Sequence, residues 1–291
     1  MKNNSGRLAD LYEALQTNPN TGLTDEKAAL VGKLGKPECY YFPPQLNNYA
    51  GDFPVTYFGF APDVTREQVM ERLRHFSDFD TRITELSRAY RLQLGTGWYT
   101  PAGVIHAPGS LLTYEPQWNS DVNSVFENIP SGQVLPKHML IKHCPEDKKD
   151  DWDFIFSLLD WEKNVDPDYR KHYFRPPIDI PGRPAGCAEK WIMYANPYVA
   201  AKELTLLPGR EATITDDAAY GLILAQGRGR LGSFLCETPT LIRFGQQTCD
   251  EFFVSESAAK KGVHIKNESP VEPLVMLKHF GPNSGCPAEI G

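Results

Sequence analysis

Short runs of apolar and β-branched residues, separated by turn residues, dominate the second half of the chain. The runs lie at 198–206, 220–224, 240–244, 251–254, 263–265 and 274–277. Strands that recur at such short intervals are typical of a β sandwich or barrel. The 24 prolines and 23 glycines agree with a turn-rich β protein.

The first half of the chain mixes strand and helix patterns. Residues 38–60 and 90–115 carry aromatic and β-branched runs broken by proline and asparagine turns, which predict strands. Residues 7–34 and 63–76 instead show apolar positions at helical spacing. Thr65 is the predicted N-cap of the second helix.

A segment of another kind joins the two halves. Residues 147–161 predict one helix with acidic residues in its first turn, and the following residues predict an extended, proline-rich stretch. We therefore expect an N-terminal unit at 1–129, a helical and extended connecting segment at 130–186, and a C-terminal β unit at 187–291.

The composition and charge of the chain argue against nucleic acid and membranes as partners. The chain has 291 residues, 41% of them hydrophobic, and a net charge of -7 with acidic and basic residues interspersed. It therefore predicts a substantial core and no basic stripe for nucleic acid or anionic lipid. No secretory signal and no apolar run of 18 residues is found, so we expect a cytoplasmic protein that does not bind membranes. Its six cysteines form no Cys-x-x-Cys pair and predict reduced thiols.

One segment combines glycine, proline and histidine in an informative order. It reads Gly95-Thr-Gly-Trp-Tyr-Thr-Pro101-Ala-Gly103-Val-Ile-His106. Glycine permits backbone conformations that other residues resist, and proline stops a strand from continuing straight. An imidazole delivered from such a turn is a candidate metal ligand.

The spacing of these glycine, proline and histidine residues resembles the second signature of the cupin superfamily. Cupins are small antiparallel jelly-roll barrels that commonly hold a divalent metal. The resemblance implies a mainly β fold with two cupin (jelly-roll) barrels and accessory helices, a bicupin. The run Gly227-Arg-Gly-Arg-Leu-Gly232 resembles the hairpin centre of the same fold, and no helix follows it as a phosphate-binding loop would require.

A narrower resemblance to type I mannose-6-phosphate isomerases covers roughly residues 15–128. That family has, in order, Gln-x-His-Pro, Lys-[Pro or Thr]-Glu, Thr-Arg-Glu, Pro-[Ala or Ser]-Gly-x-x-His-Ala and Glu-x-Gln-x-Ser-Ser-Asp. The chain has Gln16-Thr-Asn18-Pro19, Lys36-Pro37-Glu38, Thr65-Arg66-Glu67, Pro101-Ala-Gly-Val-Ile-His106-Ala107 and Glu115-Pro-Gln117-Trp-Asn-Ser120-Asp121.

The family binds zinc through its Gln, first His, Glu and last His. Carried over, these positions imply Gln16, Glu38 and His106 as metal ligands, with Asn18 in place of the fourth. An asparagine carbonyl is a weaker zinc ligand than an imidazole, so affinity falls or preference moves toward Mn²⁺ or another divalent ion. The alternative interpretation, with no metal role, places Gln16 at a helix end and Asn18 in a turn before Pro19.

The resemblance also implies a catalytic role for Lys36, which would position the enediolate oxygen or relay the proton. The alternative interpretation of Lys36 is a solvated surface lysine. The family has an arginine after Ser-Asp, whereas this chain has Val125 in that region. This departure weakens the prediction of the family's own reaction.

The second barrel is expected to be metal-free. A metal-binding cupin would offer His-x-His and a glutamate between residues 209 and 227, where this chain has Thr215, Asp216, Asp217 and Tyr220. We expect this barrel to serve packing or subunit contact, since exposed strand edges of jelly rolls can pair in a homodimer.

The resemblance implies a metal-dependent isomerase of carbohydrate metabolism that interconverts the aldose and ketose forms of a small-molecule sugar or sugar phosphate. Two alternatives remain open. One is a non-catalytic carbohydrate-binding or regulatory bicupin, which the changes at Asn18 and Val125 suggest. The other is a metal-dependent cupin lyase or dioxygenase.

Overall fold

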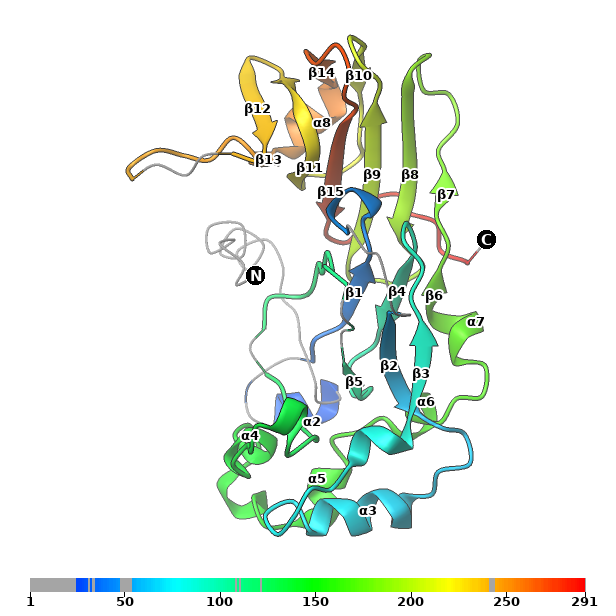
Figure 1. The fold of residues 1–291 in the computed structure, drawn as a ribbon, viewed down its shortest axis with the longest axis vertical. Helices are drawn as coiled ribbons and strands as arrows, with labels where there is room; N and C mark the ends of the chain where they lie inside the picture. The colour runs from blue at the N-terminus through cyan, green and yellow to red at the C-terminus, as the bar shows by residue number, and fades with distance from the viewer. Residues whose placement is uncertain are drawn as a thin grey trace.

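The computed structural model describes residues 25–30, 32, 35–47, 54–107, 109, 111–120, 122–240 and 244–290. Helices α3, α4 and α5 gather at one end of an elongated molecule, and a large curled sheet forms the other end (Figure 1). Two small sheets lie between them. No helix among the described residues is long and apolar enough to cross a membrane.

Two three-stranded antiparallel sheets build the N-terminal unit, and one of them takes its third strand from the connecting segment. The first has the order β1 (Glu38–Tyr41), β4 (Gly97–Thr100), β6 (Phe174–Arg175). The second has the order β3 (Ser87–Arg91), β2 (Val55–Phe60), β5 (His106–Ala107). Between them lies an aromatic core that includes Tyr40, Phe58 and Trp98. The strands predicted within 38–60 and 90–115 are thus present, in shorter pieces.

Helix α3 (Arg66–Arg74) confirms the helix predicted near residues 63–76. Thr65 caps it: its hydroxyl accepts from the backbone N–H of Gln68, and the Gln68 side chain accepts from the backbone N–H of Thr65. This reciprocal capping box satisfies donors that a helix start leaves open. Its apolar face packs on a second core with α5 and the loop that carries Val122. Of the helices predicted in 7–34, only α2 (Asp25–Ala29) lies among the described residues.

The single helix predicted over 147–161 is wrong. The connecting segment instead forms short helices: α4 (His138–Ile141), α5 (Trp152–Phe156), α6 (Trp161–Asn164) and α7 (Tyr169–Tyr173). Asp151 accepts from the backbone N–H of Phe154, and Asp160 accepts from that of Lys163. Each aspartate starts a new helix, because a side chain that caps competes with continuation of the helix through it. Among the described residues, 3₁₀ turns also lie at Pro44–Leu46, Ile83–Leu86, Pro130–Gly132 and Glu146–Lys148.

The C-terminal unit is a nine-stranded antiparallel sheet curled around its own core. Its main order is β10 (Glu211–Ile214), β14 (Val263–Asn267), β11 (Tyr220–Leu231), β15 (Leu274–Phe280), β9 (Ala200–Leu206), β8 (Cys187–Met193), β7 (Ile178–Asp179). Strands β12 (Phe234–Thr238) and β13 (Glu251–Val254) pair with β11, and α8 (Glu256–Lys261) precedes β14. The β11–β12 hairpin turns at Gly232, as its sequence predicts. Of the strand predicted at 240–244, residues 241–243 lie outside the described residues and Phe244 lies in a turn.

The two units pack through alternate residues of the same strands. On β15, Met276 faces the interior of the C-terminal unit, whereas Val275 and Leu277 face the N-terminal unit. Strand β1 does the same from the other side, since Tyr41 joins the shared core while Tyr40 faces inward. The twofold alternation of strand side chains therefore serves two cores with one strand.

A tyrosine–histidine contact crosses this interface. The hydroxyl of Tyr114 lies 2.8 Å from Nδ1 of His279 on β15. Gly221, directly opposite His279 on β11, makes room for the imidazole: a Cβ there would lie 2.0 Å from Nε2 of His279. His279 is therefore a structural residue of the interface.

We expect His279 to make stability depend on pH. Burial lowers the pKa of His279 to about 4, whereas an unfolded histidine titrates near 6.5. Between these values the unfolded chain binds more protons, so the free energy of unfolding falls as pH falls, by up to about 3 kcal/mol. Denaturant titrations from pH 7 to 4 should show a shallower fall for His279→Gln than for the wild type. Parallel pH profiles would contradict this.

Candidate active site

Strand β1 carries Glu38 into the N-terminal interior. Tyr40, two residues further on, packs against Phe58 there, and side chains two apart on a strand share a face. The Glu38 residue is only 4% exposed. The sheet thus holds a carboxylate at a fixed position in an aromatic interior.

The glycine–proline turn delivers His106 to the same place. Gly95 and Gly103 have φ angles of +76° and +80°, which favour glycine. The turn leads into β5, where His106 pairs with Phe58 of β2. Nε2 of His106 lies 3.0 Å from Oε2 of Glu38, and Nδ1 lies 2.8 Å from the carbonyl oxygen of Val104. Since carbonyl and carboxylate oxygens only accept, Nδ1 donates to Val104 and Nε2 donates to Glu38.

Lys36 completes an ionic cluster around the Glu38 carboxylate. Its ammonium group pairs with Oε1 of Glu38, and the Lys36 side chain is 18% exposed. The structure therefore brings together three residues that the sequence singles out, Lys36, Glu38 and His106. The other two, Gln16 and Asn18, lie outside the described residues.

Opposite charges control the titration of this cluster. Burial raises the pKa of Glu38, but His106 and Lys36 outweigh burial and lower the pKa to about 2. Burial lowers the pKa of His106, and the Glu38 carboxylate outweighs it, so the pKa of His106 is raised. Glu38 therefore remains a carboxylate at neutral pH and favours any positive partner.

Glu115, the first residue of the Glu115-Pro-Gln117 segment, is a further member of the site, and the family resemblance implies no role for it. Its segment runs antiparallel to β1: Gln117 is bridged to Glu38, and the backbone N–H of Cys39 donates to the carbonyl of Pro116. Burial and the neighbouring Glu38 carboxylate raise the pKa of Glu115 to about 7. A glutamate followed by proline in a loop carries no local sign of burial, so only its place in the motif could have indicated this.

Two donors of the cluster fit a divalent cation. A carboxylate oxygen and an imidazole nitrogen are ligands that zinc and manganese accept, and the Val104 carbonyl fixes the tautomer of His106 as partners of metal-bound histidines do. Among the described residues, no group of three or more His, Cys, Asp or Glu side chains is arranged to hold a metal ion. A complete site therefore needs donors beyond Glu38 and His106.

The interior of the C-terminal unit holds buried lysines. Nζ of Lys278 lies 2.8 Å from Oδ2 of Asp216, and Nζ of Lys202 lies 2.6 Å from Oδ1 of the same carboxylate. Lys278 also pairs with Glu189, which in turn pairs with Arg183. Asp216, one of the residues found where a metal-binding barrel would have ligands, thus binds two ammonium groups.

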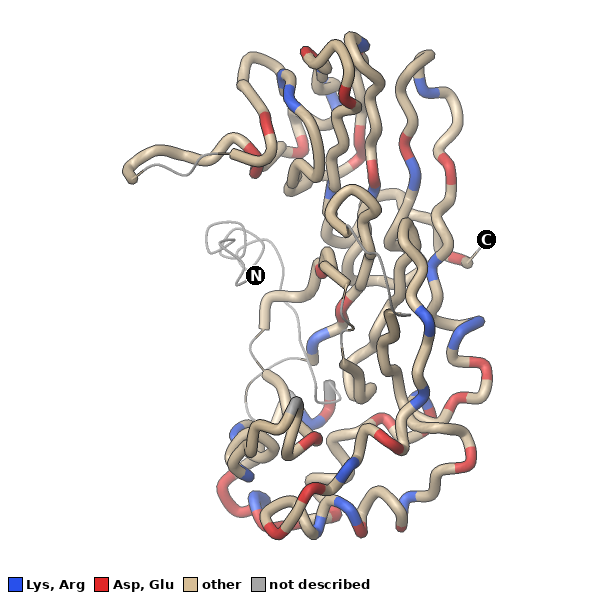
Figure 2. Tube along the Cα trace, viewed as in Figure 1, with Lys and Arg blue, Asp and Glu red and all other residues tan. Residues whose placement is uncertain are grey.

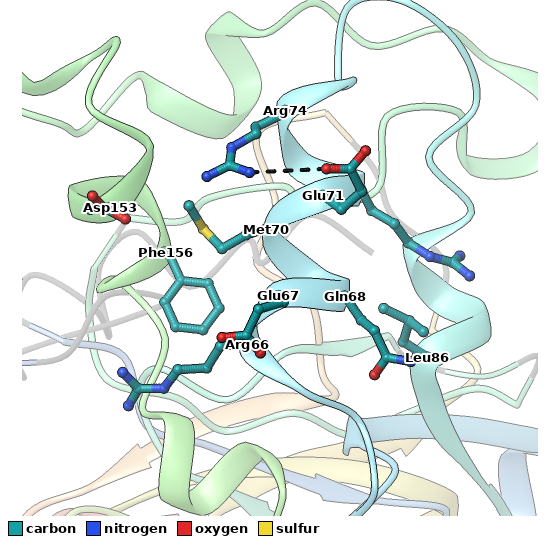
Figure 3. A pocket seen from close by; sticks show the side chains of 10 residues that line it. Arg66, Glu67, Gln68, Met70, Glu71, Arg74, Leu86, Asp153 and Phe156 are labelled. Carbon is teal, nitrogen blue, oxygen red and sulfur yellow. Dashed lines mark ion pairs between the residues drawn. The ribbon is translucent and has the colours of Figure 1, made fainter.

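A groove of about 770 Å³ lies apart from Lys36, Glu38, His106 and Glu115, none of which lines it. Figure 3 shows residues of α3 on one side and Asp153 and Phe156 of α5 on the other, with the Glu71–Arg74 ion pair at the rim. Its charges are mixed, as they are along the described trace as a whole (Figure 2). This groove has no single sign of charge to select a ligand.

Solved structures with a similar fold are known. A provisionally assigned mannosephosphate isomerase from Archaeoglobus fulgidus matches 91% of this chain and 69% of its own, at 17% identity and a TM-score of 0.54. The chain has the cupin fold. The resemblance to type I mannose-6-phosphate isomerases predicted from the ordered motifs is also found in this structural match.

Two further cupin structures match less closely. An oxalate decarboxylase variant from Bacillus subtilis matches 87% of this chain and 64% of its own, at 15% identity and a TM-score of 0.42. An RmlC-like cupin from Ralstonia eutropha matches 37% of this chain and 63% of its own, at 8% identity and a TM-score of 0.27. No family model and no curated protein matches the sequence. The mainly β architecture follows from the strands themselves, and the chemistry must be argued from the site.

Proposed function

We propose that this cupin is a divalent-metal-dependent isomerase that interconverts the aldose and ketose forms of a sugar or sugar phosphate. The observation that carries the proposal is the 3.0 Å contact between Nε2 of His106 and Oε2 of Glu38. The fixed tautomer of His106 and the persistent charge of Glu38 support a shared cation, most simply zinc.

The reaction moves a proton between two neighbouring sugar carbons, C1 and C2, through an enediol. When bound between Glu38 and His106, the metal would polarise the sugar carbonyl and the adjacent hydroxyl. Lys36 contacts the same carboxylate, so its ammonium group is positioned to donate a hydrogen bond to the oxygen on which negative charge develops.

We assign the proton transfer to Glu115. Burial and the neighbouring Glu38 carboxylate raise its pKa, so it brings a second carboxyl group to the cluster. A carboxyl group can take a proton from one carbon and return it to the next. Antiparallel pairing of its segment with β1 holds this group in place, as a base that acts on two adjacent carbons requires.

Glu115→Gln should therefore separate catalysis from binding. We expect kcat to fall by about 100-fold or more, because general-base catalysis contributes that much, while KM changes by less than about threefold. Steady-state assays with mannose and fructose and their 6-phosphates would measure both. Glu237→Gln, on the distant strand β12, is a control that should retain wild-type rates. An equal loss in both variants would refute the assignment.

A substrate screen tests the function itself. Purified protein reconstituted with zinc or manganese should interconvert at least one aldose–ketose pair among common hexoses and their phosphates. Sugar binding without turnover would favour the carbohydrate-binding alternative. Oxygen consumption with bound iron would favour a dioxygenase.

A further inference from the structure

Thr100 is an interior neighbour of Glu38. The two residues lie directly opposite each other in the antiparallel β1–β4 pair. Side chains at opposed positions point to the same face of a sheet. Thr100 therefore faces the aromatic interior, at the end where Glu38 meets His106.

The Thr100 hydroxyl is buried without a partner. Thr100 is 1% exposed, and its Oγ1 has no hydrogen-bond partner within the described part of the chain. A buried polar group left unpaired costs free energy, and a valine would fill the same volume in a strand without that cost. Packing alone therefore does not explain a threonine here.

Other buried threonines behave differently. The hydroxyl of Thr56 donates to the carbonyl of Ala107, and that of Thr81 bonds to Oδ1 of Asn128. Both residues are at most 3% exposed. Among the three buried threonines that the structure describes, Thr100 alone lacks a partner, and it alone stands opposite Glu38.

We propose that the Thr100 hydroxyl binds a hydroxyl group of the sugar substrate and so helps to select polyhydroxylated substrates. This inference rests on the proposed isomerase function. A sugar with its carbonyl end at Glu38 and His106 would place a neighbouring hydroxyl beside strand β4. A site built to pair with a substrate hydroxyl rejects analogues that lack it, because its own polar group then stays unpaired.

The test compares Thr100→Val with Thr100→Ser on the full-length, metal-loaded protein. We expect Thr100→Val to raise KM by about tenfold, the value of one hydrogen bond, and Thr100→Ser to stay within about threefold of the wild type. The melting temperature of Thr100→Val should equal or exceed that of the wild type. Thr81→Val is the matched control, and should lower the melting temperature without changing KM.

Deoxy sugars supply a signature that a structural role would not produce. With the wild type, we expect one singly deoxygenated form of the best substrate to have a kcat/KM about tenfold lower than that of the parent sugar. With Thr100→Val, the same deoxy sugar and the parent sugar should have equal kcat/KM values. An unchanged KM in Thr100→Val, or a lowered melting temperature, would overturn the inference while leaving the isomerase function intact. A wild-type protein that turns over no sugar would overturn both.

Discussion

Replacing His106 by alanine is expected to lower isomerase activity by about 1,000-fold or more. The imidazole is one of two donors that face each other across 3.0 Å, and without it the cation loses a ligand and its orientation. Metal ions supply several kcal/mol of transition-state stabilisation in reactions of this kind, which corresponds to this factor. Steady-state kinetics at saturating sugar, with zinc or manganese added, would measure the loss.

A second histidine provides the control. His264 lies on β14 in the C-terminal unit, so His264→Ala should keep activity within about threefold of the wild type. Both variants should show the circular dichroism spectrum of the wild type, because His106 is partly exposed and its removal leaves the aromatic core in place. Wild-type activity in a folded His106→Ala variant would show that His106 is not part of the active site.

Replacing Lys278 by methionine is expected to lower the free energy of unfolding by about 3–5 kcal/mol. The Lys278, Glu189 and Asp216 side chains are all 0% exposed. Methionine would leave two buried carboxylates with one positive partner each, and breaking a buried ion pair by removing one member costs about this much. Urea or guanidinium denaturation at pH 7 would measure the difference.

The matched control is a lysine in an exposed pair. Lys260 lies 2.6 Å from Glu256 on α8, and both side chains are more than half exposed. Lys260→Met should cost less than about 1 kcal/mol, because water screens such pairs. If Lys278→Met were no more destabilising than Lys260→Met, the interior network would contribute nothing measurable to stability.

Local patterns account for what the sequence could predict. Gly95 and Gly103 of the glycine–proline turn adopt positive φ angles, and Thr65 forms the expected helix cap. Both signals are confined to a few neighbouring residues, where backbone preference is strong. The contact between Glu38 and His106 was predicted only through family resemblance, since 68 residues separate them.

The long-range ion pairs of the interior could not be predicted from the sequence. Lys278 follows an apolar run on β15, so its local pattern indicates only a polar strand residue. Its partners Glu189 and Asp216 come from β8 and from the loop after β10. The helix predicted over 147–161 was wrong for a different reason: its apolar residues fit the spacing of one helix, whereas Asp151 and Asp160 each cap a separate short helix. Burial and charge partners of this kind emerge only when the strands are assembled.

The central claim is that Glu38 and His106 hold one divalent cation in the N-terminal unit. Calorimetric titration of chelator-treated protein with zinc tests it most directly, with the wild type, Glu38→Gln, His106→Ala and the control His264→Ala compared at pH 7. We expect one site per chain in the wild type and in His264→Ala, and an affinity weaker by about 100-fold or more in the other two. A wild type that binds no cation, or equal affinity in all four proteins, would contradict the claim.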